Sequence, residues 1–270
     1  MPDQPAPRER ILVFIPAYRC AAQIGRVLAQ FVPEIRGRFS EILVVENRSP
    51  DDTLAAAVAA AGALDGLAVT VVQNTDNYSL GGSHKVAFAY AIAHRFDYLV
   101  VLHGDDQGAI ADLLPQLDKG AHRACDSLLG ARFAPGATLS GYSWFRTFGN
   151  HVFNALITAV TWHRVYDMGA GLNMYKTAFL EERFYLHFPN NLTFNVFMLY
   201  YSFWKRSPTV FFPLTWREDD QISNARIFRQ AWIILGLTWR YLVGARALFA
   251  RTTPAGAMAY TSTVVFQRQA

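Results

Sequence analysis

Tyr98-Leu-Val-Val-Leu-His-Gly-Asp-Asp-Gln-Gly108 is the stretch of sequence that decides the fold. Its first five residues are all apolar or aromatic, which is typical of a central parallel strand covered on both faces. A polar cluster follows at once, with His103, Asp105, Asp106 and Gln107. In open α/β sheets, ligands bind beyond the carboxyl ends of the strands, and hard oxygen ligands suit Mg²⁺ or Mn²⁺. The stretch therefore indicates a metal and phosphate site, although a plain Gly-Asp turn explains it equally well.

Strand-like and helix-like segments alternate on either side of this stretch. Apolar runs at 11–15, 41–45, 67–73 and 98–102 predict buried strands, and 22–31, 54–63 and 81–94 predict the helices between them. This order is typical of an α/β protein with a doubly wound, mostly parallel sheet. Further strands are expected at 127–129, 172–175 and 210–214.

Two glycine-containing turns suit a ligand. Gly81-Gly-Ser-His-Lys85 opens a predicted helix, where backbone amides and the helix dipole attract a diphosphate. An ordinary helix cap explains Ser83 equally well. In Asp167-Met-Gly-Ala-Gly171, small residues would let the backbone approach a ligand beside the Asp167 carboxylate, and the alternative is a simple turn.

Length and charge indicate one large domain with a distinct C-terminal segment. The chain has 270 residues and a net charge of +4, but 221–270 contains six arginines and no acidic residue. We therefore expect a domain over 1–220 and a basic, amphipathic helical tail over 221–270. The rest of the chain is nearly balanced in charge, so nucleic-acid binding by the main domain is not indicated. Two cysteines form no disulfide framework and the polar N-terminus is no signal peptide, which together favour the cytoplasm.

Two helical segments invite different interpretations. Residues 142–216 hold 21 of the 38 aromatic residues, and 148–162 carries apolar residues at helical spacing. We interpret that stripe as core packing in preference to a ligand surface. Arginines interrupt the candidate helix at 222–250, so its uncharged apolar stretch is too short to span a membrane. It suits an in-plane helix on an anionic bilayer, or a helix packed on the protein itself.

Taken in order, the motifs of residues 11–226 resemble those of the GT-A glycosyltransferases of family 2. The resemblance is strongest to the branch of dolichol-phosphate mannose synthase and bacterial polyprenyl-phosphate sugar transferases. Within Leu102-His-Gly-Asp-Asp-Gln107, which resembles the family's Leu-Asp-x-Asp, His103 replaces the first aspartate and Asp105 retains the second, usually the metal ligand. The other matching segments are Ile15-Pro-Ala-Tyr18, Val44-Val-Glu-Asn-Arg-Ser49 with Asp51 and Thr53, Asn77 to Lys85, Gly130-Ala-Arg-Phe133, and Asp167 to Lys176.

The resemblance implies a GT-A fold and a metal-dependent, inverting transfer from a nucleotide-diphosphate sugar to a polyprenyl phosphate. It implies that Mg²⁺ or Mn²⁺ is held by Asp105, helped by Asp106 and His103. Arg132 would bind the acceptor phosphate, with Arg217 as second choice. The residues implied at the donor are Pro16, Tyr18, Glu46, Asn47 and Asp51 for the nucleoside end and Lys85 for the diphosphate.

Two rival functions remain open at this point. A transferase of the same fold could act on a saccharide hydroxyl, with Asp167, Asp219 or Asp220 as the base. The other is a non-catalytic module that binds a nucleotide-sugar. The observation that most favours it is His103, which replaces the first aspartate of the family's motif. The expected location is cytoplasmic, peripheral on the inner face of the cell membrane, and the oligomeric state stays open, a homo-oligomer included.

Overall fold

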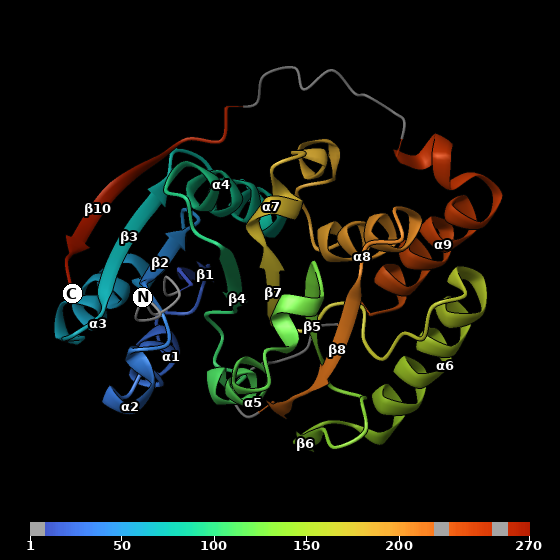
Figure 1. The fold of residues 1–270 in the computed structure, drawn as a ribbon, viewed down its shortest axis with the longest axis horizontal. Helices are drawn as coiled ribbons and strands as arrows, with labels where there is room; N and C mark the ends of the chain where they lie inside the picture. The colour runs from blue at the N-terminus through green and yellow to red at the C-terminus, as the bar shows by residue number, and fades with distance from the viewer. Residues whose placement is uncertain (1–8, 219–226, 250–258) are drawn as a thin grey trace, which may run out of the picture.

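The computed structural model describes residues 9–218, 227–249 and 259–270, and these form one large sheet with helices on both faces (Figure 1). The sheet has eight strands in the order β10-β3-β2-β1-β4-β7-β5-β8, and β6 pairs with β9 in a separate two-stranded sheet. The strands are β1 (Ile11–Ala17), β2 (Glu41–Glu46), β3 (Ala68–Asn74), β4 (Tyr98–Leu102), β5 (Ser127–Ala131), β6 (Thr138–Ser140), β7 (Leu172–Lys176), β8 (Thr209–Pro213), β9 (Thr215–Arg217) and β10 (Ser262–Arg268).

The predicted mostly parallel sheet is confirmed. Strands β1 to β4 run parallel, with Val13 of β1 paired to Ile42 of β2 on one side and to Val100 of β4 on the other. Strand β7 is antiparallel to both β4 and β5, and β8 is again parallel to β5. The five residues of β4 are all buried, as the apolar run at 98–102 predicts for a central strand.

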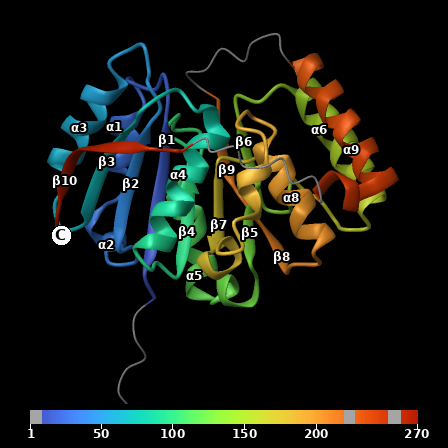
Figure 2. The same cartoon turned by 90° about the horizontal axis from the view of Figure 1, so that it is seen from above.

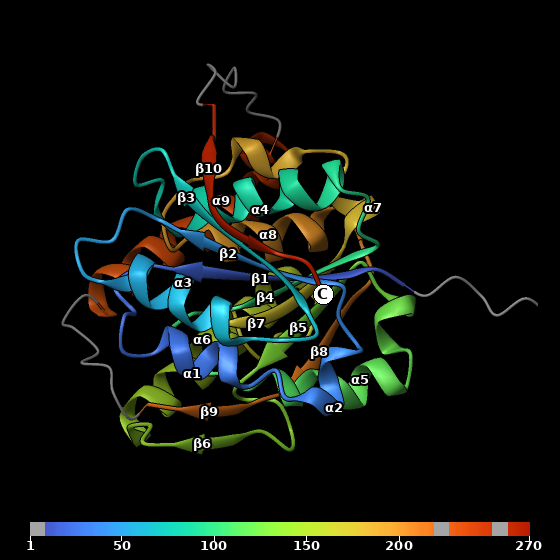
Figure 3. The ribbon, with the colours of Figure 1, turned by 90° about the vertical axis from the view of Figure 1, so that its left-hand side faces the viewer.

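Helices cover both faces of the sheet (Figure 3). Because side chains alternate along a strand, Val13 belongs to the apolar cluster that includes residues of α1, α3 and α5, while Phe14 belongs to the cluster on the other face, with residues of α4, α8 and α9. The α-helices are α1 (Ile24–Ala29), α2 (Pro33–Arg36), α3 (Thr53–Ala63), α4 (Ser79–Ala93), α5 (Leu114–Asp118), α6 (Trp144–Thr161), α7 (Thr177–Leu180), α8 (Phe194–Trp204) and α9 (Ile227–Phe249). In the described residues, we find no helix with the length and apolar character that crossing a membrane requires.

The C-terminal segment differs from the helical tail that the sequence predicts for 221–270. Helix α9 is present, but β10 then pairs antiparallel with β3, from Ser262 opposite Asn74 to Arg268 opposite Val69. A run rich in β-branched residues is suited to satisfy the open hydrogen-bonding edge of β3. The boundary at 220 is therefore wrong as a division between a sheet domain and a helical tail, because the last strand belongs to the main sheet.

The interpretation of 148–162 as a core stripe is also wrong. Helix α6 lies at the far end of the molecule from β10 (Figure 1), and although Ile157 is buried, most of its apolar side chains in this stripe are exposed. Phe148, Val152 and Leu156 are 61%, 52% and 40% exposed. Periodicity identifies an apolar helix face, but it does not identify what that face contacts.

Candidate functional site

The loops that follow β1 and β2 are tied together at the carboxyl edge of the sheet. The Arg19 amide donates to the Ser49 hydroxyl at 3.1 Å, and the Cys20 amide donates to Thr53 Oγ1 at 2.9 Å. The Asn47 amide donates to the Ala17 carbonyl at 3.0 Å. This arrangement brings the predicted nucleoside-binding loops side by side, as the topology of parallel strands requires.

Within these loops, Glu46 and Asn47 hold the protein together instead of facing solvent. The buried Glu46 carboxylate accepts hydrogen bonds from the amides of Ser49 at 2.6 Å and Arg48 at 3.2 Å, and from Gln73 Nε2 at 2.9 Å. Asn47 Oδ1 accepts from the Tyr78 amide at 2.9 Å. Both residues therefore shape the loops, which is a correction to the expectation of direct nucleoside contact.

Other predicted donor residues remain accessible at the same edge. Tyr18 is 44% exposed, and Asp51 is exposed with Oδ1 accepting from the Thr53 hydroxyl at 2.7 Å. Pro16 lies at the end of β1, where its carbonyl accepts from the Gly104 amide at 3.2 Å. A Cβ at position 104 would lie 2.9 Å from that carbonyl, so only glycine lets the β4 loop approach β1 this closely.

The polar cluster after β4 is fixed from two sides. The His103 amide donates to the Gly171 carbonyl at 2.9 Å, and a Cβ at Gly171 would lie 3.0 Å from His103 Cγ. His103 Nε2 is buried and has no hydrogen-bond partner among the described residues. Burial lowers the pKa of His103, so its imidazole is neutral at physiological pH.

The two carboxylates of this cluster have different environments. Asp106 has a left-handed backbone with φ 59°, and its carboxylate accepts from Arg26 Nε at 2.8 Å and Gln30 Nε2 at 3.0 Å. Asp105 Oδ1 accepts only one bond within the described residues, a 3.3 Å contact from the Gln107 amide. Arg217 Nη2 lies a further 3.6 Å from Asp106 Oδ1. Asp106 is therefore paired within the protein, where the sequence leads us to expect help in holding a metal.

The remaining residues fit a divalent ion that a substrate helps to coordinate. No group of three or more His, Cys, Asp or Glu side chains converges anywhere in 9–218, 227–249 or 259–270. Mg²⁺ sites of this kind commonly use one or two carboxylates together with phosphate oxygens and water. Asp105, with the unpartnered Nε2 of His103 nearby in the loop, meets that requirement. Neither Arg26 nor Gln30 was identified from the sequence, because both lie about eighty residues from Asp106 in an ordinary helical segment.

Asp167 forms a buried ion pair with Arg132. Arg132 Nε and Nη2 donate to the two carboxylate oxygens at 2.7 and 2.8 Å, and the Arg132 amide adds a bond of 3.0 Å. The side chains are only 14% (Arg132) and 2% (Asp167) exposed. Burial alone would raise the pKa of Asp167, but the charge and hydrogen bonds of Arg132 outweigh it and hold that pKa below its usual value. Asp167 is therefore not available as a base, which corrects the expectation that it could activate a saccharide hydroxyl.

Arg132 also lies among aromatic rings. Its Cζ is 5.0 Å from the Trp216 ring centroid, 5.5 Å from that of Phe133 and 6.0 Å from that of Tyr142. Nη1 makes no hydrogen bond within the described residues, so one nitrogen of the guanidinium remains for a ligand. The edge that would bind a phosphate through Nε and Nη2 is already occupied by Asp167. Asp219 and Asp220, the other candidate bases, lie outside the described residues.

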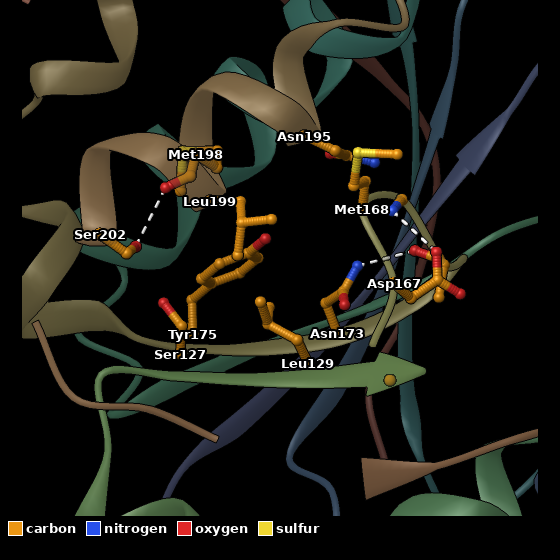
Figure 4. Close-up of a pocket in the computed structure, with 13 residues that line it drawn as sticks. Ser127, Leu129, Asp167, Met168, Asn173, Tyr175, Asn195, Met198, Leu199 and Ser202 are labelled. Atoms are coloured by element: carbon orange, nitrogen blue, oxygen red, sulfur yellow. Dashed lines mark hydrogen bonds between the residues drawn. The ribbon is translucent and has the colours of Figure 1, made fainter. Parts of the chain in front are cut away.

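A small cavity lies beside Asp167, between β5, β7 and α8 (Figure 4). Its lining is mixed, with Tyr175 and Asn195 among the labelled side chains. Ser127 Oγ and Asn195 Oδ1 are buried there without a partner in the described residues. Buried polar atoms of this kind are usually satisfied by ordered water.

Lys85 lies elsewhere than the sequence predicts. Nζ donates to the carbonyls of Phe188 at 2.6 Å and Leu186 at 3.2 Å, to Asn190 Oδ1 at 2.7 Å and to the Tyr260 hydroxyl at 3.1 Å. Burial lowers the pKa of Lys85 to about 8, so the amine stays mostly protonated at neutral pH. Lys85 therefore joins α4 to the 186–190 loop and to the residues just before β10, and its amine is already bound within the protein.

Lys85→Met gives a direct measure of this structural role. The substitution takes the Lys85 donor from the carbonyls of Leu186 and Phe188 and removes one of the donors to Asn190 Oδ1, so we expect the free energy of unfolding to fall by about 2–4 kcal/mol. The donor affinity of the protein that remains folded should stay unchanged. Denaturant unfolding and nucleotide-sugar titration measure the two quantities. A large loss of donor affinity with wild-type stability would restore Lys85 to the diphosphate site.

Comparison with known proteins gives one family and a consistent fold. The family described as Glycosyl transferase family 2 matches residues 12–184. A polyprenol monophosphomannose synthase of Mycolicibacterium smegmatis is 28% identical over 182 residues, which cover 65% of this chain and 65% of that relative. The match thus spans slightly less than two thirds of the relative's length.

Solved structures show the same architecture at low identity. A glucosyl-3-phosphoglycerate synthase from Mycobacterium tuberculosis, in complex with phosphoglyceric acid, is 16% identical with a TM-score of 0.58, over 97% of this chain and 90% of that one. A mannosyltransferase from Pyrobaculum calidifontis, in complex with GDP-Man and Mn²⁺, is 18% identical with a TM-score of 0.57, over 92% and 72%. These likenesses confirm the predicted GT-A fold.

Proposed function

The chain belongs to glycosyl transferase family 2, and on that premise we propose that it transfers a hexosyl group from a nucleotide-diphosphate sugar to a polyprenyl phosphate. Membership of the family makes the chain a glycosyltransferase. The lipid-phosphate acceptor is supported by the likeness to a polyprenol monophosphomannose synthase. The site geometry adds an independent argument about the acceptor.

The buried Arg132–Asp167 pair is the observation that carries the acceptor proposal. A saccharide hydroxyl must lose a proton when it attacks, and that chemistry calls for a positioned base. Asp167 is bound on both oxygens by Arg132, and Glu218 is bound to Arg146 at 2.5 Å. A phosphate is already ionised at neutral pH and needs no base. Within the part of the site that the structure describes, these pairings favour an acceptor that arrives as an anion, which the positive charge of Arg132 attracts.

At the donor side, Tyr18 and Asp51 would contact the nucleoside, and the loops ordered by Glu46 and Asn47 would hold these residues in place. Asp105, with His103 beside it, would hold Mg²⁺ or Mn²⁺. A bound ion would supply positive charge that stabilises the departing nucleotide diphosphate. The acceptor oxygen would form its bond to the anomeric carbon from the face opposite the breaking bond, which gives inversion.

The proposed enzyme works peripherally on the inner face of the cell membrane. A long isoprenoid acceptor is confined to the bilayer, so the transferase must reach the membrane surface. Helix α9 contains arginines but no acidic residue, which suits anionic lipid.

A comparison of two acceptors, supplied separately, tests the proposal. The protein is given its preferred nucleotide-sugar, identified by the rise in melting temperature with Mn²⁺, together with a polyprenyl phosphate or a soluble oligosaccharide. We expect labelled lipid only, and no product after chelation of the metal. Transfer to the oligosaccharide alone would instead establish a hydroxyl acceptor, and transfer to the lipid in the presence of chelator would remove the metal from the mechanism.

A further inference from the structure

Two helices at one end of the molecule present apolar side chains to the outside. Helices α6 and α9 pack against each other (Figure 2). We call their exposed apolar side chains the α6–α9 face. Its members are Trp144, Phe145, Phe148, Val152 and Leu156 on α6, and Trp232, Ile233, Trp239, Leu242 and Val243 on α9, each between 40% and 79% exposed. Exposed apolar side chains gathered on two helices that pack together are typical of an interaction site.

The inner side of α6 explains why its apolar side faces outward. The buried Asn154 donates from Nδ2 to the Tyr166 carbonyl at 2.6 Å, and Thr158 Oγ1 accepts from the Val165 amide at 3.0 Å. Thr161 is also buried. Helix α6 thus directs several of its polar residues toward the protein and its aromatic residues away from it, the reverse of an ordinary surface helix.

The charges around the face favour one kind of partner. The sequences of α6 and α9 contain no Asp or Glu, while Arg240 and Arg246 of α9 are exposed. A second copy of the chain docked through this face would bring arginines together without acidic partners on these helices. Anionic lipid head groups would pair with the arginines, and the tryptophans suit the interface between head groups and acyl chains.

We propose that the α6–α9 face lies in the surface of an anionic lipid bilayer, with the aromatic residues of α6 inserted among the acyl chains. This inference rests on the proposed function, since a lipid-linked acceptor is what brings the enzyme to a membrane. It goes further by assigning the main contact to α6, which precedes the basic C-terminal segment and contains only one arginine.

Helix α6 is joined at both ends to the Arg132 site. At its start, Arg146 pairs with Glu218, and its Cζ lies 4.4 Å from the Tyr142 ring that also faces Arg132. Near its end, Asn154 and Thr158 fix residues 165 and 166, which lead directly into Asp167. A helix seated in the membrane surface would therefore hold Arg132 near the level of the head groups. The acceptor's isoprenoid could stay in the bilayer while its phosphate reaches the site.

Vesicle sedimentation of the full chain tests the face. Phe145→Gln with Phe148→Gln removes two exposed side chains without touching the core. Val264→Thr with Val265→Thr is the matched control, since Val264 and Val265 are 55% and 45% exposed on β10, at the other end of the molecule. We expect the α6 pair to weaken binding to phosphatidylglycerol–phosphatidylcholine vesicles by about tenfold or more, and the control to bind as wild type. High salt should weaken the vesicle binding of the wild type, but it should not abolish the part of binding that comes from apolar contacts.

Two outcomes overturn the inference. One is wild-type vesicle binding by the α6 pair, and the other is a wild-type dimer that the α6 pair converts to a monomer, which would assign the face to a second copy. Activity separates this inference from the proposed function. The α6 pair should keep wild-type transfer to a short, water-soluble prenyl phosphate and lose about tenfold or more with a long-chain acceptor embedded in vesicles. If the wild type transfers to neither acceptor, the proposed function fails, while sedimentation still reports on the face.

Discussion

Asp105→Asn is expected to lower sugar transfer by at least a factor of about one hundred while the fold is retained. Asp105 is half-buried and accepts one weak backbone bond within the described residues, so neutralising it should hardly change the melting temperature. The loss would arise because the carboxylate that we assign to Mg²⁺ or Mn²⁺ has gone. Initial rates at several Mn²⁺ concentrations, measured beside a thermal melt, check both parts.

The neighbouring Asp106→Asn is the matched control, because it makes the same change of charge one residue away. Asp106 accepts from Arg26 and Gln30, so its substitution should lower stability and leave the dependence on Mn²⁺ unchanged. Equal loss of metal dependence in both variants would show that the two carboxylates share the ion. Full activity of the Asp105 variant would remove the metal site from this position.

Asp167→Ala is expected to reduce the free energy of unfolding by about 3–5 kcal/mol, because it leaves the Arg132 guanidinium buried without its counter-charge. Denaturant unfolding measures this loss. The double variant Arg132→Met, Asp167→Leu should recover most of the stability, since it removes both charges together.

The rate of sugar transfer should distinguish the roles of Arg132 and Asp167, which the free energies of unfolding do not. The double variant should remain at least about a hundredfold slower than wild type, since Arg132 no longer attracts the acceptor phosphate. A stable Asp167 variant that is completely inactive, with Arg132 intact, would instead make Asp167 a catalytic base and favour a hydroxyl acceptor.

The sequence predicted the strands well because a buried central strand must be apolar on both faces. The run at 98–102 became β4, and 41–45 became most of β2. Strand β10 was missed because none of its side chains is buried, so it lacks the apolar run of a central strand, and because it follows a basic helix. Its partner β3 is almost two hundred residues away, so only the folded chain reveals the pairing.

The site was predicted less well, for a related reason. Motif order correctly brought the loops after β1, β2 and β4 to one edge of the sheet. The hydrogen-bond partner of each polar side chain at that edge depends on contacts between distant segments of the chain. Lys85 and Asp167 look like ligand residues in sequence, and both are satisfied within the protein by residues that no local pattern connects to them. A polar residue in a motif shows its chemistry, and only the fold shows whether that chemistry is still available.

The position of β10 has a consequence for how the protein is made. The ribosome synthesises β3 long before β10, yet β10 covers the open edge of β3 and Tyr260 supplies one of the four oxygens around Lys85. Until residues 260–268 leave the exit tunnel, the nascent chain carries an uncapped strand edge, the kind of surface that chaperones protect from aggregation.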